Sequence, residues 1–242
     1  MIKGKLETIK HKIEQACHKA GRDPGSVRVL AVSKSFDAQA INEAKALGIS
    51  YFGENRVQEA RDKAAEGVFQ DTTLCMIGHL QTNKASLTTR IFDEVHSVDR
   101  PKLATALSKF SLKYRDCPLP VYLQVNISGE RNKHGCKPGE AYELARYILE
   151  LEGLELRGLM TIPPLSQPPG DSRLHFRNLR LLRDHMLSMG IPAQNLQELS
   201  MGMSSDYEVA IKEGATVIRL GTALFGPRLA KGKDPEAASW NS

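Results

Sequence analysis

The sequence lacks several features that define whole classes of protein. It has only 4 cysteines in 242 residues, without metal-ligand spacing, and no apolar signal-peptide segment follows Met1. No run approaches the ~18 apolar residues of a membrane span. The net charge is +5, but no run of five like charges occurs, which argues against a nucleic-acid-binding tract. We therefore expect a cytoplasmic protein with reduced thiols, without a metal site, and without a membrane or nucleic acid as partner.

Short apolar runs instead alternate with longer amphipathic stretches along the chain. The predicted strands are Val27–Ser33, Ser50–Gly53, Thr73–Gly78, Asp93–Val98, Leu119–Ile127, Leu154–Met160, Leu196–Met201 and Thr216–Leu220. The predicted helices are Gly4–Ala20, Asp37–Leu47, Asn55–Glu66, Lys84–Thr89, Pro101–Tyr114, Pro138–Glu152, Leu174–Met189 and Asp206–Glu213. Alternation of this kind indicates a parallel sheet, and eight units favour a closed (β/α)8 TIM barrel over an open doubly wound sheet. The first helix is an addition to the simple barrel pattern.

The chain contains no obvious linker between domains. The breaker-rich stretch from Ile162 to Gly170 is interpreted as the loop after the sixth strand. We predict a single barrel domain over residues 1–229, followed by a loosely held, disordered tail over residues 230–242, where Trp240 could dock.

Polar residues follow the ends of most predicted strands, where the active groups of an α/β barrel stand. These candidates are Lys34, Asn55, His79, Asn126, Thr161, Ser204, Ser205, Arg219, Gly221 and Thr222. In barrels of this class, phosphates often bind after strands seven and eight. The residues from Ser204 to Ser205 and from Gly221 to Thr222 occupy those two places.

Lys34 ends the first predicted strand, where an ammonium is either solvated or functional. A functional amine must be neutral to attack an aldehyde, and desolvation together with a cation such as Arg219 favours that form. After the seventh and eighth predicted strands, a dianion could be held by the hydroxyls of Ser204, Ser205 and Thr222 and by the backbone around Gly221. The alternative is that these residues simply form a helix cap and a turn. An amine and an anion cradle together indicate pyridoxal 5′-phosphate. A barrel that binds a sugar or nucleotide phosphate, with Lys34 as a phosphate contact, remains the alternative.

Arg219 interrupts an otherwise apolar strand, so an inward-pointing guanidinium there needs a partner. The partner is either a carboxylate, such as Glu208 or Glu213, or the pyridine nitrogen of the cofactor. Arginine only donates hydrogen bonds, so that nitrogen would be unprotonated and the ring a weaker electron sink. This arrangement favours storage of the cofactor over carbanion chemistry.

Four further residues have two interpretations each. Asn55 either holds a cofactor oxygen or caps the next helix. Met203 either packs on the ring face or belongs to the core. We expect His79 to be a hydrogen-bonded framework residue rather than an acid–base group, and Lys133 to be a solvated loop residue rather than a second anion contact.

Several segments in order resemble the pyridoxal phosphate homeostasis protein family. They are Ala31–Lys34, Phe52–Asn55, Ile77–Gln81, Gly158–Thr161, Ser200–Asp206 and Ile218–Thr222, within a resemblance that covers Val27 to Arg228. The family is similar to the barrel half of fold-type III pyridoxal phosphate enzymes such as alanine racemase, without the additional β domain. Arg56 and Thr82 depart from the residues expected in many relatives.

The resemblance implies a role for each candidate. Lys34 would hold the cofactor covalently as an aldimine, a Schiff base, while Ser204, Ser205, Gly221 and Thr222 would lie at its phosphate and Arg219 at its ring nitrogen. It implies a role in vitamin B6 homeostasis and in amino-acid and keto-acid balance, with apo pyridoxal phosphate enzymes as possible recipients. Because the racemase β domain is missing, we expect the barrel to be a monomer. The alternative is an amino-acid racemase, which needs a second acid–base group besides Lys34. No convincing candidate for that group is visible in the sequence.

Overall fold

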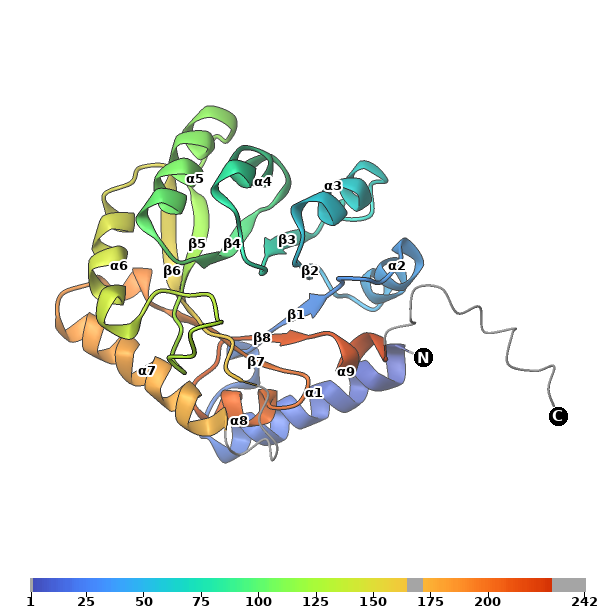
Figure 1. Cartoon of the computed structure of the whole chain (residues 1–242). Coiled ribbons are helices and arrows are strands. Elements are labelled where there is room, and N and C mark those ends of the chain that lie inside the picture. The colour runs from blue at the N-terminus through green and yellow to red at the C-terminus, as the bar shows by residue number, and fades with distance from the viewer. Residues whose placement is uncertain (1, 165–171, 228–242) are drawn as a thin grey trace.

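Eight parallel strands close into a barrel in which β1 pairs with both β2 and β8 (Figure 1). The computed structural model describes residues 2–164 and 172–227. The strands are β1 (Arg28–Val32), β2 (Tyr51–Glu54), β3 (Thr73–Met76), β4 (Glu94–Val98), β5 (Leu119–Gln124), β6 (Leu154–Met160), β7 (Glu198–Met203) and β8 (Val217–Leu220). The predicted TIM barrel and all eight predicted strands are therefore confirmed, with small differences at their ends.

Helices surround the barrel and cover the outer faces of the strands (Figure 1). They are α1 (Ile2–Lys19), α2 (Ala38–Ala46), α3 (Val57–Ala65), α4 (Ala85–Ile91), α5 (Pro101–Tyr114), α6 (Ala141–Leu149), α7 (Ser172–Ser188), α8 (Tyr207–Lys212) and α9 (Thr222–Phe225). Short 3-10 turns are η1 (Pro24–Ser26), η2 (Thr82–Lys84), η3 (Pro138–Glu140) and η5 (Ala193–Asn195). The sequence predicted α1 to α8 but not α9, which at four residues is too short to show a helical period.

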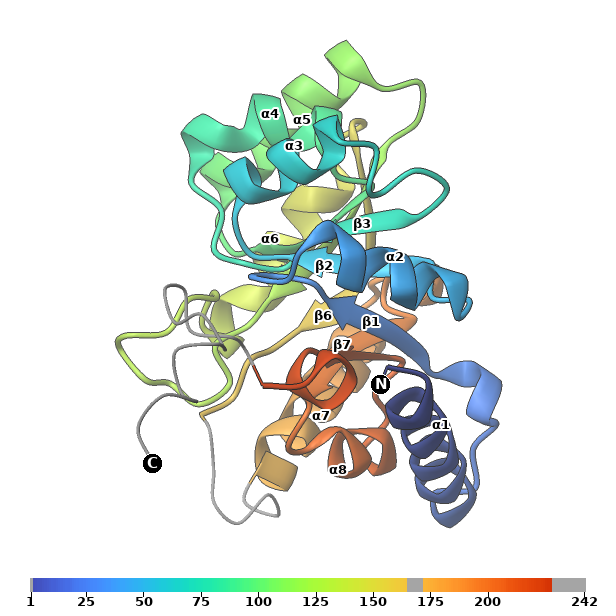
Figure 2. The same ribbon diagram turned by 90° about the vertical axis from the view of Figure 1, so that its right-hand side faces the viewer.

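The additional N-terminal helix is part of the fold. Leu6, Ile9 and Ile13 recur at helical spacing on its buried face. That face packs against α8 and α9, and Figure 2 shows α1 beside α8 on the outside of the barrel. The helix therefore covers α8 and α9, which follow β7 and β8, near the place where β8 pairs with β1 and closes the barrel.

Two glycines allow neighbouring strands and the segments after them to approach closely. A Cβ at Gly158 would lie 1.9 Å from the carbonyl oxygen of Glu198 on β7. A Cβ at Gly78 would lie 2.2 Å from the carbonyl oxygen of Asn55. Both contacts are with backbone, so no side chain could turn away to relieve them. The glycines consequently set the spacing of β2, β3, β6 and β7.

Three predictions fall partly or wholly outside the described residues. The tail at residues 230–242 lies beyond them, and so does the greater part of the predicted loop between Ile162 and Gly170. The assignment of residues 1–229 to a single domain stays a prediction. Among the helices in the described ranges, none is both long and apolar enough to cross a membrane.

Candidate functional site

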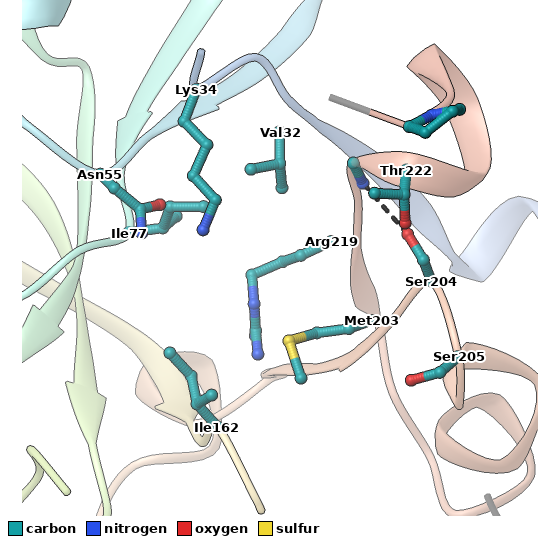
Figure 3. Close-up of a pocket in the computed structure, with 12 residues that line it drawn as sticks. Val32, Lys34, Asn55, Ile77, Ile162, Met203, Ser204, Ser205, Arg219 and Thr222 are labelled. Carbon is teal, nitrogen blue, oxygen red and sulfur yellow. Dashed lines mark hydrogen bonds between the residues drawn. The ribbon is translucent and has the colours of Figure 1, made fainter. Parts of the chain in front are cut away.

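The carboxyl ends of the strands surround a cavity of about 900 Å³. It is lined by Val32, Lys34, Asn55, Ile77, Ile162, Met203, Ser204, Ser205, Arg219, Gly221, Thr222 and Pro227. The structure thus brings all eight residues predicted to bind a cofactor into one cavity, from the ends of β1, β2, β7 and β8. Figure 3 shows Lys34 and Arg219 directed into the same space, with Ser204 and Thr222 to one side.

Polar contacts, buried at Ser33 and exposed at Ser35, hold the backbone on both sides of Lys34. The ammonium of Lys63 donates to the carbonyl oxygen of Ser33 at 2.9 Å and to Glu54 at 2.8 Å. The Ser33 hydroxyl also donates to Glu54, at 2.7 Å. Burial raises the pKa of Glu54, against the opposing effect of Lys63. On the other side, the backbone N–H of Ser35 donates to Glu59 at 2.7 Å.

This clamp holds a strained turn. Ser35 has a φ of 67°, in the left-handed region that a residue other than glycine rarely adopts. Strain of this kind persists only where surrounding contacts hold it. The half-buried Lys34 therefore leaves β1 in a direction that the buried pair of Glu54 and Lys63 helps to set.

Arg219 is buried and donates to three oxygen atoms of the barrel. Its Nη1 donates to the carbonyl oxygen and hydroxyl of Ser200 at 2.6 and 2.9 Å, and its Nη2 to the carbonyl oxygen of Thr161 at 2.8 Å. Burial lowers the pKa of this guanidinium to about 10, with Asp206 acting in the opposite direction. Its third nitrogen, Nε, has no hydrogen-bond partner among the described residues.

The carboxylate partners suggested for Arg219 by the sequence are wrong. Glu208 pairs with Lys12 at 3.0 Å, on the outside of the barrel. Glu213 pairs with Arg173 at 2.6 Å and with Arg180 at 3.3 Å. Both acids lie on or next to α8 and are already paired with other cations. The guanidinium is accordingly held in place by uncharged groups and remains available to a ligand.

At the opposite side of the cavity, two backbone N–H groups converge on one oxygen atom. The Ser204 hydroxyl oxygen accepts from Gly221 at 3.3 Å and from Ala223 at 3.1 Å. Asp206 supports this turn by accepting from the N–H of Met203 at 2.7 Å. A Cβ at Gly221 would meet nothing nearer than 3.7 Å. The protein itself thus leaves space at Gly221, which suits the close approach of a ligand oxygen.

Asn55 does not cap the next helix, so that interpretation is wrong. Helix α3 begins at Val57, its cap position is Arg56, and no side-chain cap bond forms there. Instead, Asn55 Oδ1 is buried without a hydrogen-bond partner among the described residues. Because an unpaired buried acceptor is costly, this atom points to a ligand that donates a hydrogen bond.

The other uncertain residues are also placed. Met203 is half-buried and lines the cavity. His79 is exposed, stacks on His134 with ring centroids 3.7 Å apart and lines a smaller neighbouring cavity of about 330 Å³, so its role as a hydrogen-bonded framework residue stays a prediction. Lys133 pairs with Glu130 at 3.0 Å within its own loop and does not line the main cavity.

The sequence did not reveal a polar network inside the barrel, below the cavity. It consists of Arg28, Tyr51, Glu94, His96, Tyr122, Glu198 and Ser200. A signal was present, because Glu94 and His96 are two residues apart on β4 and therefore share one face. Their partners come from strands distant in the sequence, which a pattern cannot identify.

Comparison with known proteins gives consistent matches over nearly the whole chain. Residues 5–228 match the family model described as alanine racemase, N-terminal domain. A pyridoxal phosphate homeostasis protein of Aquifex aeolicus is 41% identical over 224 residues, which cover 93% of this chain and 97% of that protein. One from Pseudomonas aeruginosa is 43% identical, with coverage of 92% and 94%.

Solved structures agree with these matches. The structure of PipY from Synechococcus elongatus, with PLP bound, superposes with a TM-score of 0.80 at 36% identity and covers 93% of this chain and 100% of PipY. An alanine racemase of Clostridium difficile gives a TM-score of 0.69 at 15% identity, a likeness of fold alone. That match covers 97% of this chain but 59% of the racemase, which extends beyond the shared barrel.

Proposed function

The chain belongs to the pyridoxal phosphate homeostasis protein family, and on this premise we propose that it binds pyridoxal 5′-phosphate through a Schiff base on Lys34. One observation carries the proposal. An amine, a buried guanidinium and a group of hydroxyls and backbone N–H donors, from four separate strand ends, line a single cavity of about 900 Å³. These groups correspond to the aldehyde, the ring nitrogen and the phosphate of the cofactor.

Lys34 supplies the nucleophile. Its neutral Nζ would hold the cofactor through a C=N bond that replaces the C=O bond of the aldehyde, with the aldehyde oxygen released as water. Val32 and Ile77 also line the cavity beside this amine and shield the bond from solvent. When bound, the cofactor supplies an aldehyde that is stored in this bond and can be returned by hydrolysis.

The phosphate would bind where the N–H groups of Gly221 and Ala223 now converge on the Ser204 hydroxyl. A phosphate oxygen can accept the same two hydrogen bonds, while the hydroxyls of Ser204, Ser205 and Thr222 donate to the others. The absence of a side chain at Gly221 leaves the approach to these N–H groups open.

The ring of the cofactor would lie between these two ends. Arg219 donates to the ring nitrogen and keeps it unprotonated, since a guanidinium has no acceptor. The unpaired Asn55 Oδ1 accepts from the ring hydroxyl. Met203 contributes an apolar contact at the cavity wall.

We infer that this arrangement stores and releases the cofactor, and so serves vitamin B6 balance and, through it, amino-acid and keto-acid balance. Among the described residues that line the cavity, Lys34 is the only lysine, and the lining includes no histidine, carboxylate, cysteine or tyrosine. Racemisation needs a second acid–base group on the opposite face of the substrate. The contact of Arg219 with the ring also weakens the ring as an electron sink.

The absorption spectrum of the purified protein mixed with pyridoxal 5′-phosphate tests the proposal. We expect a yellow band in the wild type and in Lys84→Ala, which changes a lysine of the neighbouring 330 Å³ cavity, but not in Lys34→Ala. Borohydride reduction should then attach one pyridoxyl phosphate group to the peptide that contains Lys34. An uncoloured wild type that still binds sugar phosphates would refute the cofactor assignment.

A second assay tests the storage role. Wild-type protein loaded with cofactor is mixed with an apo pyridoxal phosphate enzyme, and the recovery of that enzyme's activity is followed. Transfer is expected, whereas loss of optical rotation from a pure L-amino acid that depends on Lys34 would favour the racemase instead.

A further inference from the structure

A chain of hydrogen bonds leads from Arg219 down into the barrel, through residues to which the proposed function gives no role. Arg219 Nη1 lies 2.9 Å from the Ser200 hydroxyl, which lies 3.0 Å from His96 Nδ1. His96 Nε2 lies 3.1 Å from Glu94 Oε2. The side chains of Arg219, Ser200 and His96 are buried, with exposures of 3%, 0% and 0%.

The proton positions along this chain follow from its two ends. Arginine only donates, so the Ser200 oxygen accepts from Arg219 and its own proton is free to be donated to His96 Nδ1. A neutral imidazole that accepts at Nδ1 carries its proton on Nε2, which donates to Glu94. All three bonds therefore point the same way, from the guanidinium to the carboxylate. Bonds aligned in this manner polarise one another.

The charges needed for this arrangement are supported by their surroundings. Burial would raise the pKa of Glu94, but hydrogen bonds from His96 and Tyr51 and the charge of Arg28 lower it to about 2. Burial lowers the pKa of His96, against the opposing effect of Glu94, so the imidazole is neutral. The ring of Tyr122 packs on His96 with centroids 3.9 Å apart. Glu94 is thus a carboxylate that reaches Arg219 only through two neutral groups.

The same region contains a grouping that could hold a metal ion, but the hydrogen bonds describe it better. Ligand atoms of Cys75, Glu94 and His96 lie within 4.8 Å of one another. His96 Nε2 and Glu94 Oε2 are already bonded to each other. The guanidinium of Arg28 lies 4.0 Å from Glu94, and this positive charge opposes a second cation.

We propose that Ser200, His96 and Glu94 are positioning residues that hold the guanidinium of Arg219 aimed at the ring nitrogen of the cofactor. This inference rests on the proposed function and adds to it a determinant of ligand specificity. Ser200 connects Arg219 to His96, because its backbone carbonyl and its hydroxyl both accept from Arg219 Nη1 and the hydroxyl also contacts His96. Without the hydroxyl, the guanidinium keeps only carbonyl partners and loses its connection to Glu94.

Binding of two ligands tests the proposal. One is pyridoxal 5′-phosphate and the other is its analogue with C–H in place of the ring nitrogen, which gives Arg219 nothing to contact. We expect Ser200→Ala to weaken binding of pyridoxal 5′-phosphate about fivefold and to leave binding of the analogue unchanged. The ratio of the affinity for pyridoxal 5′-phosphate to the affinity for the analogue therefore falls. Glu94→Gln should lower this ratio as well.

The matched control is Ser97→Ala on β4. Ser97 is also fully buried, and its hydroxyl has no hydrogen-bond partner among the described residues. The Ser97→Ala variant should leave the ratio of the two ligand affinities unchanged. General damage to the barrel would weaken both ligands equally, so an unchanged ratio in Ser200→Ala would overturn the proposal.

A second measurement uses the protein without cofactor. ¹⁵N NMR of the imidazole, assigned with His96→Gln, should show a proton on Nε2 and none on Nδ1. A proton on Nδ1 would contradict the chain even in a protein that binds the cofactor well. Failure of the wild type to bind pyridoxal 5′-phosphate would count against the proposed function instead. The tautomer of His96 would still decide whether the hydrogen bonds run from Arg219 to Glu94 as proposed.

Discussion

Replacement of Lys63 by methionine should destabilise the barrel in a pH-dependent way. Lys63 Nζ contacts Glu54, whose side chain is fully buried. Glu54 Oε2 already lacks a partner among the described residues. In Lys63→Met the carboxylate would keep only the Ser33 hydroxyl as a donor, so the folded protein would take up a proton on Glu54. Burial raises the pKa of Glu54 in the wild type, and loss of the Lys63 charge raises it further.

The size of the effect follows from the cost of that proton. The ordinary pKa of 4.5 lies about 2.5 pH units below pH 7, so protonation costs at most about 3.4 kcal/mol there. At pH 5 the same cost is at most about 0.8 kcal/mol. When the pKa of a carboxyl group is higher in the folded than in the unfolded protein, the folded protein loses stability as the pH rises. The penalty of Lys63→Met should therefore grow from pH 5 to pH 7 by up to about 2.6 kcal/mol.

Urea denaturation followed by circular dichroism at several pH values measures this difference. Lys45→Met is the matched control, since Lys45 donates to the carbonyl oxygens of Val68 and Gln70 and to no carboxylate among the described residues. Its penalty should be the same at both pH values. A penalty for Lys63→Met that does not change between pH 5 and pH 7 would refute the reasoning.

Three further predictions concern packing, titration and reactivity. Gly158→Ala should destabilise the barrel by about 3 kcal/mol or prevent folding, because its Cβ would clash with the Glu198 backbone; thermal unfolding measures this. His79 should titrate below 6.5 by NMR, since burial and the stacked His134 lower its pKa, and His134→Gln should raise that value. Of the four thiols, only exposed Cys117 should react quickly with a thiol reagent in native protein; a second fast thiol would contradict the buried positions.

The sequence allowed the barrel to be predicted because each unit carries its own local signals. Asp37 was recognisable as a helix cap and accepts from Ala40 at 2.9 Å as expected. Gly48, with a φ of 88°, ends the same helix. Since parallel strands of a barrel place their carboxyl ends together, residues after those ends had to meet. The eight predicted binding residues are neighbours for this reason.

The partners of those residues could not be predicted in the same way. Arg219 is bonded to Ser200 and to Thr161, which precede it by 19 and 58 residues. Lys63 reaches back 30 residues to Ser33. Such contacts depend on the register of neighbouring strands and on which side chains enter the barrel. The sequence suggested Glu208 and Glu213 as carboxylate partners of Arg219, but both are paired with other cations.

The interior of the barrel contains an apolar cluster and a polar chain, and Tyr51 contacts both because it belongs to the cluster and bonds to Glu94. The cluster consists of Leu30, Val32, Tyr51, Cys75, Ile77 and Val217. Val32 and Ile77 line the cavity together with Lys34, where they would shield the proposed bond to Lys34 from water. The polar chain leads from Glu94 through His96 and Ser200 to the buried Arg219. A barrel filled only with branched apolar residues would be simpler to pack, but it would leave the guanidinium without a route to a carboxylate. The proposed ligand above the polar chain gives a reason for it, because the fold alone does not require it.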